Sequence, residues 1–554
     1  MGKNLRLTFV YFFAAIIVVG VSEVVAVSII DLNQTTANLS IYGANFTDHI
    51  GHTVAIGDIN NDGIMDLLLG VPFGHYAGKQ TGLAYVIYGK NYAANEVIDL
   101  NVVNTDITIV GKGSLSDLGY SIASGDVNND GIDDILVGSR TSDTSAGVDT
   151  GEAYVIYGSS NFGPNRIIDL NTAQADITIR GANATDGLGY SVVSRDVNGD
   201  GIDDIIVGAP KVKTSLGFVV GEAYVIYGSS NFGPNRIIDL NTAQADITIR
   251  GKNAQAWLGI SVASGDINLD GINDIVIGSF GADPPGRNFA GEAYVIYGSS
   301  NFGPNKIIDL NTAQADITIR GRKSFDRLGS SVTSNDVNKD NIDDVIVGAP
   351  EANPADRPSA GIVYVIFGSR NFRNKIIDLN STQAGISIFG KFSFDGLGLS
   401  LASGDINNDG ISDIIIGAKG AGPLGRRGGE VYVIYSNKNF RNKIIDLNST
   451  LADVTISGAI FSDGVGTSLA SGDVNNDGKS DIIIGAFGVD KDGVAEVGAV
   501  YVLYGVPTNT QQTTTSSFIN PGGIELPPES RAPSRIPTFF ERLLSGFVFL
   551  IFKR

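Results

Sequence analysis

Seven short segments of this chain carry oxygen-bearing side chains at one fixed spacing. Each segment reads Asp-x-Asn-x-Asp and has a further Asp at position 9, as in Asp126, Asn128, Asp130 and Asp134. Carboxylate and amide oxygens at positions 1, 3, 5 and 9, with a backbone carbonyl at position 7, can surround one hard cation. Since Ca²⁺ accepts about six to eight oxygen ligands in flexible geometry, the spacing predicts one calcium site per segment.

The same five positions supply the candidate ligands in every segment, so up to seven Ca²⁺ ions are expected. The candidate ligands are Asp58, Asn60, Asp62, Ile64, Asp66; Asp126, Asn128, Asp130, Ile132, Asp134; Asp196, Asn198, Asp200, Ile202, Asp204; Asp266, Asn268, Asp270, Ile272, Asp274; Asp336, Asn338, Asp340, Ile342, Asp344; Asp405, Asn407, Asp409, Ile411, Asp413; Asp473, Asn475, Asp477, Lys479, Asp481. Position 7 supplies only its carbonyl oxygen, so the lysine in the last segment is compatible with a cation site.

The residues around these ligands distinguish the segments from an EF-hand loop. Position 12, which is glutamate in an EF-hand, is apolar in every copy, as at Val137. Position 6 is a glycine that allows a sharp turn, except that Asn341 stands there in the fifth copy, which we expect to be the weakest site. The alternative is a set of Asx-turns, in which Asp and Asn side chains bond their own backbone.

The composition excludes several other kinds of chemistry. The chain has no cysteine and three histidines, which rules out disulfides, zinc–thiolate sites and thiol catalysis and leaves few imidazole ligands. With 59 acidic and 39 basic residues the formal charge is −20, so nucleic acid is not an expected partner. Metal-free loops would hold like charges close together, so bound calcium is expected to stabilise the fold.

The acidic segments belong to a longer unit that is repeated seven times. Their first residues lie 68 to 70 residues apart, and a second marker, Ile/Val-Ile-Asp-Leu-Asn, recurs with them at Ile29, Val97, Ile167, Ile237, Ile307, Ile376 and Ile444. Self-similarity at a fixed period indicates a repeat architecture rather than several unrelated domains.

Each unit contains four short runs rich in Val, Ile and Tyr, bounded by Gly, Asp and Asn, which predicts four strands. Four strands per unit favour an all-β, seven-bladed β-propeller of four-stranded blades, with a linear β-solenoid as the alternative. The last unit lacks one strand, and residues 39–42 precede the first inner strand. An N-terminal strand is therefore expected to complete the last blade and leave no edge unpaired.

The string from Leu118 to Gly138, closed by Gly151–Gly158, resembles the FG-GAP repeat, and Val207–Pro210 and Val347–Pro350 match its Gly-Ala-Pro element. The resemblance covers about residues 29–505. It implies the seven-bladed propeller of integrin alpha chains, Ca²⁺ in the acidic loops on the lower face, and closure by an N-terminal strand.

The two ends of the chain differ from the repeats. Residues 1–26 predict a secretory signal, because Lys3 and Arg6 precede an apolar run and a small-residue cleavage site, with an uncleaved anchor as the alternative. Residues 506–538 predict a Pro/Thr-rich linker, and residues 539–554 a short hydrophobic segment that fits an interfacial segment, a sorting signal or a truncated product. A secreted or cell-surface protein is expected, with membrane attachment and oligomeric state left open.

The face opposite the acidic loops is the expected binding face. Its loops differ most between copies and carry basic or bulky residues: Lys211, Lys213, Trp257, Arg287, Arg322, Lys323, Phe325, Arg327, Arg357, Phe394, Arg426 and Arg427. Loops on a rigid scaffold are where binding residues concentrate. We therefore expect a calcium-binding adhesion module for an extracellular protein or glycan; solvated turns, or a Trp257 that plugs the channel mouth, are the alternatives.

Two other functions compete with adhesion. The first is a purely structural cell-surface repeat protein, and the second is an enzyme. His49 and His52 are three residues apart and could hold a metal, but neither a third ligand nor a catalytic partner is evident in the sequence, and His75 also lies in the first unit. No enzymatic activity is therefore expected.

Overall fold

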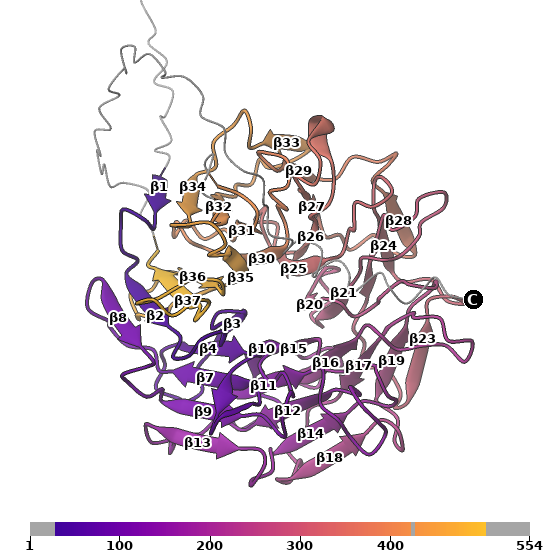
Figure 1. Ribbon diagram of the computed structural model, residues 1–554. Helices are drawn as coiled ribbons and strands as arrows, with labels where there is room; N and C mark the ends of the chain where they lie inside the picture. Colours follow the sequence, from indigo (N-terminus) through magenta and orange to yellow (C-terminus); the bar gives the residue numbers. More distant parts are fainter. Residues whose placement is uncertain (1–27, 423–426, 506–554) are drawn as a thin grey trace, which may run out of the picture. The chain divides into compact units, whose positions relative to one another are not determined.

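The computed structural model describes residues 28–422 and 427–505, which form seven β-sheets arranged as blades around a central channel (Figure 1). The predicted all-β, seven-bladed propeller is confirmed. Within the described residues the one helical element is the short 3₁₀ turn η1 (Pro354–Asp356), and no helix there is long and apolar enough to cross a membrane. The predicted signal, linker and hydrophobic C-terminal segment, and also Arg426, lie outside the described residues.

The four expected strands of each blade run from the channel outwards, and neighbours are antiparallel. The first strands are β3 (Thr53–Gly57), β10 (Ser121–Gly125), β15 (Ser191–Arg195), β20 (Val262–Gly265), β25 (Ser331–Asn335), β30 (Ser400–Gly404) and β35 (Val465–Gly472). The second strands are β4 (Asp66–Val71), β11 (Asp134–Ser139), β16 (Asp204–Ala209), β21 (Asp274–Ser279), β26 (Asp344–Ala349), β31 (Asp413–Ala418) and β36 (Asp481–Ala486).

The outer strands follow in the same order of blades. The third strands are β7 (Leu83–Ile87), β12 (Glu152–Ile156), β17 (Glu222–Ile226), β22 (Glu292–Ile296), β27 (Ile362–Ile366), β32 (Glu430–Ile434) and β37 (Ala499–Leu503). The fourth strands are β9 (Ile107–Val110), β14 (Ile177–Arg180), β19 (Ile247–Arg250), β24 (Ile317–Arg320), β29 (Ile386–Phe389), β34 (Val454–Ser457) and β2 (Leu39–Tyr42). A small hairpin of β5 (His75–Tyr76) and β6 (Lys79–Gln80) extends from the first blade.

Each sheet has a fifth strand that the sequence did not predict. It is the Ile-Ile-Asp marker of another unit, paired parallel to the fourth strand: β13 (Arg166–Asp169), β18 (Arg236–Asp239), β23 (Lys306–Asp309), β28 (Lys375–Asp378), β33 (Lys443–Asp446), β1 (Ser28–Asp31) and β8 (Glu96–Asp99). In β13, Ile168 is buried whereas Ile167 is 56% exposed. The marker therefore suits an outer edge, with one apolar side chain packed inwards and one facing solvent.

Two N-terminal strands complete the last two blades of the propeller. Strand β2 pairs antiparallel with β37, with Leu39 opposite Val502, and so supplies the fourth strand of the last blade. Strand β1 pairs parallel with β34, with Ser28 opposite Val454, and is the outermost strand of the sixth blade. Figure 1 shows indigo β2 beside yellow β37. The register agrees with the predicted closure, and it leaves both blades with a full set of strands.

The hydrophobic core consists of seven layers, each shared by two neighbouring blades. The second and third strands are buried along their whole length, as in β11 and β12. Neighbouring blades approach so closely that a Cβ on Gly138 would overlap the carbonyl oxygen of Gly189 in the next blade. The core therefore fixes the angle between blades, and with it the positions of the loops at both ends of the strands.

Candidate metal loops and the opposite face

The seven acidic segments form the loops between the first and second strand of each blade, at one face of the propeller. In the second blade, Asp126 accepts hydrogen bonds from the backbone N–H groups of Asp130 (3.1 Å to Oδ1) and Gly131 (2.8 Å to Oδ2). Asp130 Oδ1 accepts one from the N–H of Ile132 at 3.0 Å. The same three bonds recur in the other six loops. These bonds are those of the Asx-turn alternative, and they also hold the carboxylates on one side of the loop.

Position 6 adopts the left-handed conformation that the sequence requires. Gly131 has φ +84°, and Asn341, which replaces glycine in the fifth loop, has φ +63°. The N–H of Asn341 still donates to Asp336 Oδ2 at 2.7 Å. The fifth loop therefore keeps the shared geometry, and asparagine occupies a conformation that favours glycine.

The aspartate at position 9 has a second role that the sequence reasoning missed. Asp134 is fully buried; its Oδ2 accepts from the N–H of Val127 and its Oδ1 from the N–H of Gly158, both at 3.0 Å. Gly158 follows the third strand of the same blade. Equivalent bonds occur in all seven blades. This carboxylate therefore ties each loop to the end of the third strand.

Burial raises the pKa of every position-9 carboxyl. The pKa is about 7 for Asp66, Asp204, Asp413 and Asp481 and about 8 for Asp134, Asp274 and Asp344. Backbone N–H donors oppose this shift, whereas nearby loop carboxylates such as Asp130 and Asp126 add to it. A cation in the loop would favour the charged form of these groups.

The asparagine at position 3 provides a direct test of whether a cation fits. The amide oxygens of Asn60, Asn268 and Asn338 are buried and have no hydrogen-bond partner. An unpaired buried acceptor is costly unless another donor or an ion satisfies it. Between residues 28 and 505, omitting 423–426, no three Asp, Glu or His side chains are placed to hold a metal by themselves. A site here would need the mixed carboxylate, amide and carbonyl oxygens, which are the hard donors that suit Ca²⁺.

Hydrogen bonds also join the acidic loops of neighbouring blades. The N–H of Asp133 donates to the carbonyl of Asp58 in the preceding loop, and the N–H of Asp58 donates to Asp133 Oδ2 at 2.9 Å. Backbone bonds of the first kind recur in the next three blades. A change in one loop is therefore transmitted directly to its neighbour.

On the opposite face, several of the basic residues proposed to bind a partner already have partners within the chain, as Arg287 and Arg357 show. The guanidinium of Arg287 makes two bonds to Asp378, of 2.6 Å (Nη1–Oδ1) and 2.5 Å (Nη2–Oδ2). Arg357 Nη2 lies 2.7 Å from Asp446 Oδ1, at the end of the fifth strand of the same blade. Both aspartates end a fifth strand, so these arginines tie the loop between the second and third strands to the outer edge.

The aromatic residues of this face form separate pairs. Trp257 stacks on Phe280 with ring centroids 5.7 Å apart and does not line the cavity at the channel mouth. Arg327 lies over the same Phe280 ring at 5.4 Å. Phe325 stacks on Phe289 and is 58% exposed.

A cluster at the channel mouth, which the sequence reasoning missed, contains His52, Tyr120, Tyr190 and Arg140. The first three side chains begin the inner strands of successive blades, with ring centroids 4.9 Å and 4.8 Å apart. The guanidinium of Arg140 lies 3.6 Å from the centroid of Tyr120 and 5.3 Å from that of Tyr190. Its Nε donates to Asp117 Oδ2 at 2.7 Å. We call these four residues the mouth cluster.

The sequence does contain a signal for the mouth cluster. The residue after the glycine that precedes each inner strand is different in almost every blade: His52, Tyr120, Tyr190, Ile260, Ser330, Leu399 and Thr467. A cavity of about 290 Å³ lies among these inner strands. All of these residues except Leu399 line the cavity, so the side chain presented at the mouth differs from blade to blade.

The three histidines do not gather around one point. The ring of His49 packs against Phe73 and Phe487, and its Nε2 lies 3.2 Å from Glu496 Oε2. Burial, and then the positive charge of Arg140, lowers the pKa of His52 to about 3. His75 Nδ1 lies 3.4 Å from Asp48 Oδ1. The rings of His49 and His52, suggested as a metal pair, therefore lie in one aromatic environment, since both pack against Phe73 and Phe487.

Comparison with known proteins matches the repeats one by one. The FG-GAP repeat model matches residues 50–87, 118–156, 188–225, 258–296, 328–366, 397–434 and 465–503. The chain is 26% identical over 420 residues to phosphatidylinositol-glycan-specific phospholipase D of Bos taurus, covering 73% of this chain and 47% of that protein. It is 33% identical over 240 residues to integrin alpha pat-2 of Caenorhabditis elegans and 31% over 247 residues to human integrin alpha-8, covering 42% and 43% of this chain and 18% and 20% of those proteins.

These relatives correct one expectation. Proteins from several organisms that this chain matches carry the name phosphatidylinositol-glycan-specific phospholipase D, which is the name of an enzyme. The expectation of no enzymatic activity, drawn from the scarcity of His and the lack of Cys, is therefore wrong. The chain spans about half the length of the Bos taurus relative.

Proposed function

We propose that this chain, which belongs to the FG-GAP repeat family, is an exported adhesion module. Its acidic loops bind calcium and stiffen one face, and the opposite face binds an extracellular protein or glycan around the channel mouth. The single observation that carries the binding proposal is the mouth cluster, where Arg140 lies over two tyrosine rings contributed by different blades.

The calcium part of the proposal rests on the donor set of the loops. Unpartnered amide oxygens at position 3 and buried carboxyls at position 9 occur in loops that keep all four oxygen side chains. Asp58, Asn60, Asp62 and Asp66, with the Ile64 carbonyl, would hold the ion in the first loop, and the same positions would do so in the others. A bound Ca²⁺ would supply the positive charge that offsets the loop carboxylates. The bonds between adjacent loops would then spread the stiffening from blade to blade.

The binding part rests on residues that the blades do not share. Tyrosine and arginine supply large contact areas and adaptable hydrogen bonds, and they are enriched where partners bind most strongly. Tyr120 and Tyr190 are partly exposed at the mouth. Arg140 donates to Asp117 through Nε, and its two terminal nitrogens are the groups that would donate to a ligand. A rigid scaffold holds these groups in place before binding, which lowers the entropy lost on association.

Cell-surface adhesion is the setting that the relatives favour. Two of the relatives are named as integrin alpha chains, and the N-terminal residues predict export. We propose a secreted or cell-surface location, with an extracellular protein or glycan as the partner.

The experiment is a binding screen of the full chain against matrix proteins and glycans, run in calcium and in chelator. Tyr190→Ser places at the mouth the residue that the fifth blade carries as Ser330, so it tests the cluster with a side chain the scaffold already accepts. We expect a ligand bound in calcium, with affinity reduced about tenfold or more by this substitution. The control is Arg166→Ala, on the outer edge, which should bind as the parent does. A ligand bound equally by all three proteins would contradict the proposal, as would a screen without any binder, which favours a purely structural role.

A further inference from the structure

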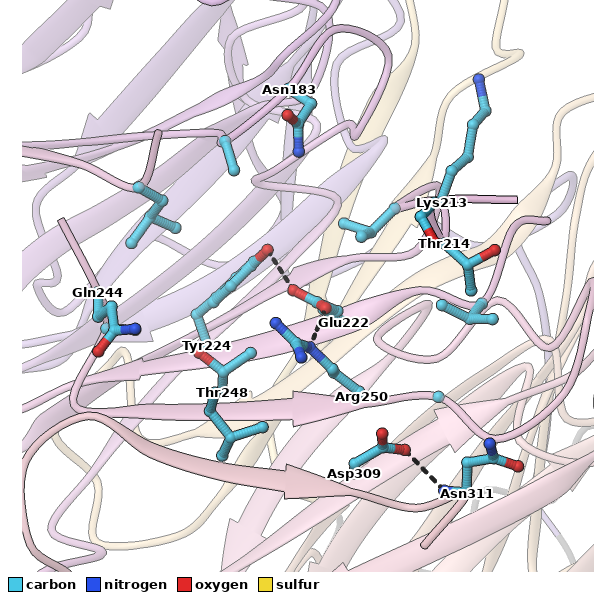
Figure 2. A pocket seen from close by; sticks show the side chains of 18 of the residues that line it. Asn183, Lys213, Thr214, Glu222, Tyr224, Gln244, Thr248, Arg250, Asp309 and Asn311 are labelled. Carbon is cyan, nitrogen blue, oxygen red and sulfur yellow. Dashed lines mark hydrogen bonds and ion pairs between the residues drawn. The ribbon is translucent and has the colours of Figure 1, made fainter. Parts of the chain in front are cut away.

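A cavity of about 560 Å³ lies on the outer rim of the propeller, between the second and third blades. One side is the turn after β18, which includes Gln244, and the other side is formed by the outer strands β17, β19 and β23 of the third blade. Figure 2 shows Tyr224, Glu222 and Arg250 pointing toward one another from β17 and β19. We call this cavity the rim groove. Its lining is distinct from that of the channel mouth and of the acidic loops.

The floor of the rim groove is a closed network of three side chains. Buried Glu222 accepts a hydrogen bond from the hydroxyl of Tyr224 at 2.6 Å and one from Arg250 Nε at 2.7 Å, as the dashed lines in Figure 2 show. The Tyr224 and Arg250 bonds go to different carboxylate oxygens. Both oxygens of the carboxylate already accept a hydrogen bond, so Glu222 is poorly suited to bind a metal ion.

The remaining lining is mostly uncharged and polar. It includes Asn183, Thr214, Ser215, Gln244, Thr248, Asn305 and Asn311, which together offer both donors and acceptors. The lining contains three cationic residues, Lys213, Arg250 and Lys252, and two anionic residues, Glu222 and Asp309, so its charge is nearly balanced. Ile307, which is 45% exposed, adds an apolar wall.

Two neighbouring cavities repeat the same construction. One of about 320 Å³ is lined by Tyr154, Thr178, Arg180, Gln174 and Ile237. The other, of about 250 Å³, is lined by Tyr294, Thr318, Arg320, Gln314 and Ile376. Both have a Glu that bonds the Tyr and the Arg, namely Glu152 and Glu292. In the fifth blade the corresponding pair is apolar, with Ile362 opposite Phe389.

We propose that the rim groove binds a neutral saccharide. A ligand with many hydroxyl groups both donates and accepts, and so matches the amides, hydroxyls and paired charges of the lining, while the C–H face of a pyranose packs on Ile307. An anion would have to compete with Glu222 for Arg250, and a cation would find its carboxylate already bonded. The groove volume lies within the range of small-molecule sites, about 300 to 1,000 Å³. This site is independent of the binding function of the mouth cluster.

The test uses the full chain in calcium with neutral oligosaccharides of two or three glucose, galactose or mannose units, and with carboxylated and sulfated sugars for comparison. Saturation-transfer NMR detects the bound sugar, and titration calorimetry gives the number bound per chain. The double variant Glu222→Ile with Arg250→Phe copies the pair that the fifth blade carries. A second variant, Gln244→Ala with Ile307→Ser, changes exposed walls and leaves the floor network intact. The matched control is Phe325→Ala, which lies on the face opposite the acidic loops and outside the rim groove.

We expect at least one neutral oligosaccharide to bind. The number bound per chain should fall by one in the double variant, and the wall variant should weaken binding at that site about tenfold. Phe325→Ala should leave sugar binding unchanged. The inference is overturned if none of the neutral sugars binds, if both groove variants bind the same number with the same affinity as the parent, or if carboxylated or sulfated sugars alone bind. The groove variants should still bind the ligand found for the mouth cluster. If the parent binds that ligand but no neutral sugar, this inference is wrong and the proposal for the mouth cluster is not affected.

Discussion

The two faces of the propeller are built from the same seven repeats but differ in what the repeats share. At the acidic face every loop keeps Asp, Asn, Asp and Asp at positions 1, 3, 5 and 9 and makes the same backbone bonds. At the opposite face the equivalent position before the inner strand is His52 in one blade, Tyr120 in the next and Ser330 in another. Interactions present in every blade serve the fold, and those present in one or two blades are where recognition can arise.

The largest expected effect comes from removing the metal that the shared face is proposed to hold. Chelator should lower the melting temperature of the full chain by at least about 10 °C, because each occupied site at a hundredfold excess over its Kd contributes about 2.7 kcal/mol. Scanning calorimetry measures it, and added Ca²⁺ should restore the parent value whereas added Mg²⁺ should not. A melting temperature that chelator does not change would contradict the proposal that the acidic face stabilises the fold by binding calcium.

A pair of substitutions in one loop separates its two roles. Asp134→Ala leaves two buried backbone N–H groups without an acceptor and should cost about 3 kcal/mol in chelator, and more in calcium because Asp134 is also a proposed ligand. Asp130→Ala, at an exposed ligand position, should be destabilising only when calcium is present. Urea unfolding of both variants in calcium and in chelator is the measurement. Equal losses for the two variants in chelator would show that position 9 does not tie the loop to the third strand.

The opposite face should show a pH effect opposite in sign to that of the acidic face, where burial raises the pKa values of the position-9 carboxyls. The folded pKa of His52, about 3, lies below the ordinary value of 6.5, so the unfolded chain binds a proton that the folded chain does not. The contribution of His52 to the free energy of unfolding is therefore fully present above about pH 6.5. It falls as the pH drops toward 3, by about 2 kcal/mol at pH 5.

The matched variant for this prediction is His52→Tyr, the residue that the next two blades carry. This variant should not show the decrease in unfolding free energy that His52 causes between pH 7 and pH 5. Urea unfolding at both pH values is the measurement. An equal change in unfolding free energy for variant and parent would mean that the fold does not lower the pKa of His52.

The smallest expected effect lies in the fifth loop. Asn341→Gly relieves a left-handed asparagine and should stabilise the chain by about 0.5 kcal/mol, with tighter calcium binding at that loop. Terbium luminescence titration and calorimetry are suitable readouts. Weaker binding in the variant would contradict the view that Asn341 makes this loop the weakest of the seven.

The repeat pattern was enough to predict the fold because each level of the sequence points the same way. The spacing of 68 to 70 residues, the Val- and Ile-rich runs and the missing last strand together indicate a closed propeller. The fifth strand was missed because Arg166–Asp169 is short and half exposed, and its partner Ile107–Val110 comes from an earlier part of the chain. Local periodicity carries no information about such a long-range parallel pairing.

The candidate sites show the same limit. Ligand positions within one loop are local and could be read from spacing, whereas the mouth cluster joins Arg140 to rings from two blades. The basic residues Arg287 and Arg357 were expected to meet a partner, yet their carboxylates lie 91 and 89 residues away in the chain. Whether an exposed-looking arginine is free depends on tertiary contacts that composition does not encode.

Native mass spectrometry of the full chain in calcium tests the central claim most directly. The account predicts a dominant species with seven Ca²⁺ ions, and one fewer ion after an Asp130→Ala substitution. A mass equal to that of the polypeptide alone, with a melting temperature that calcium does not change, would contradict it.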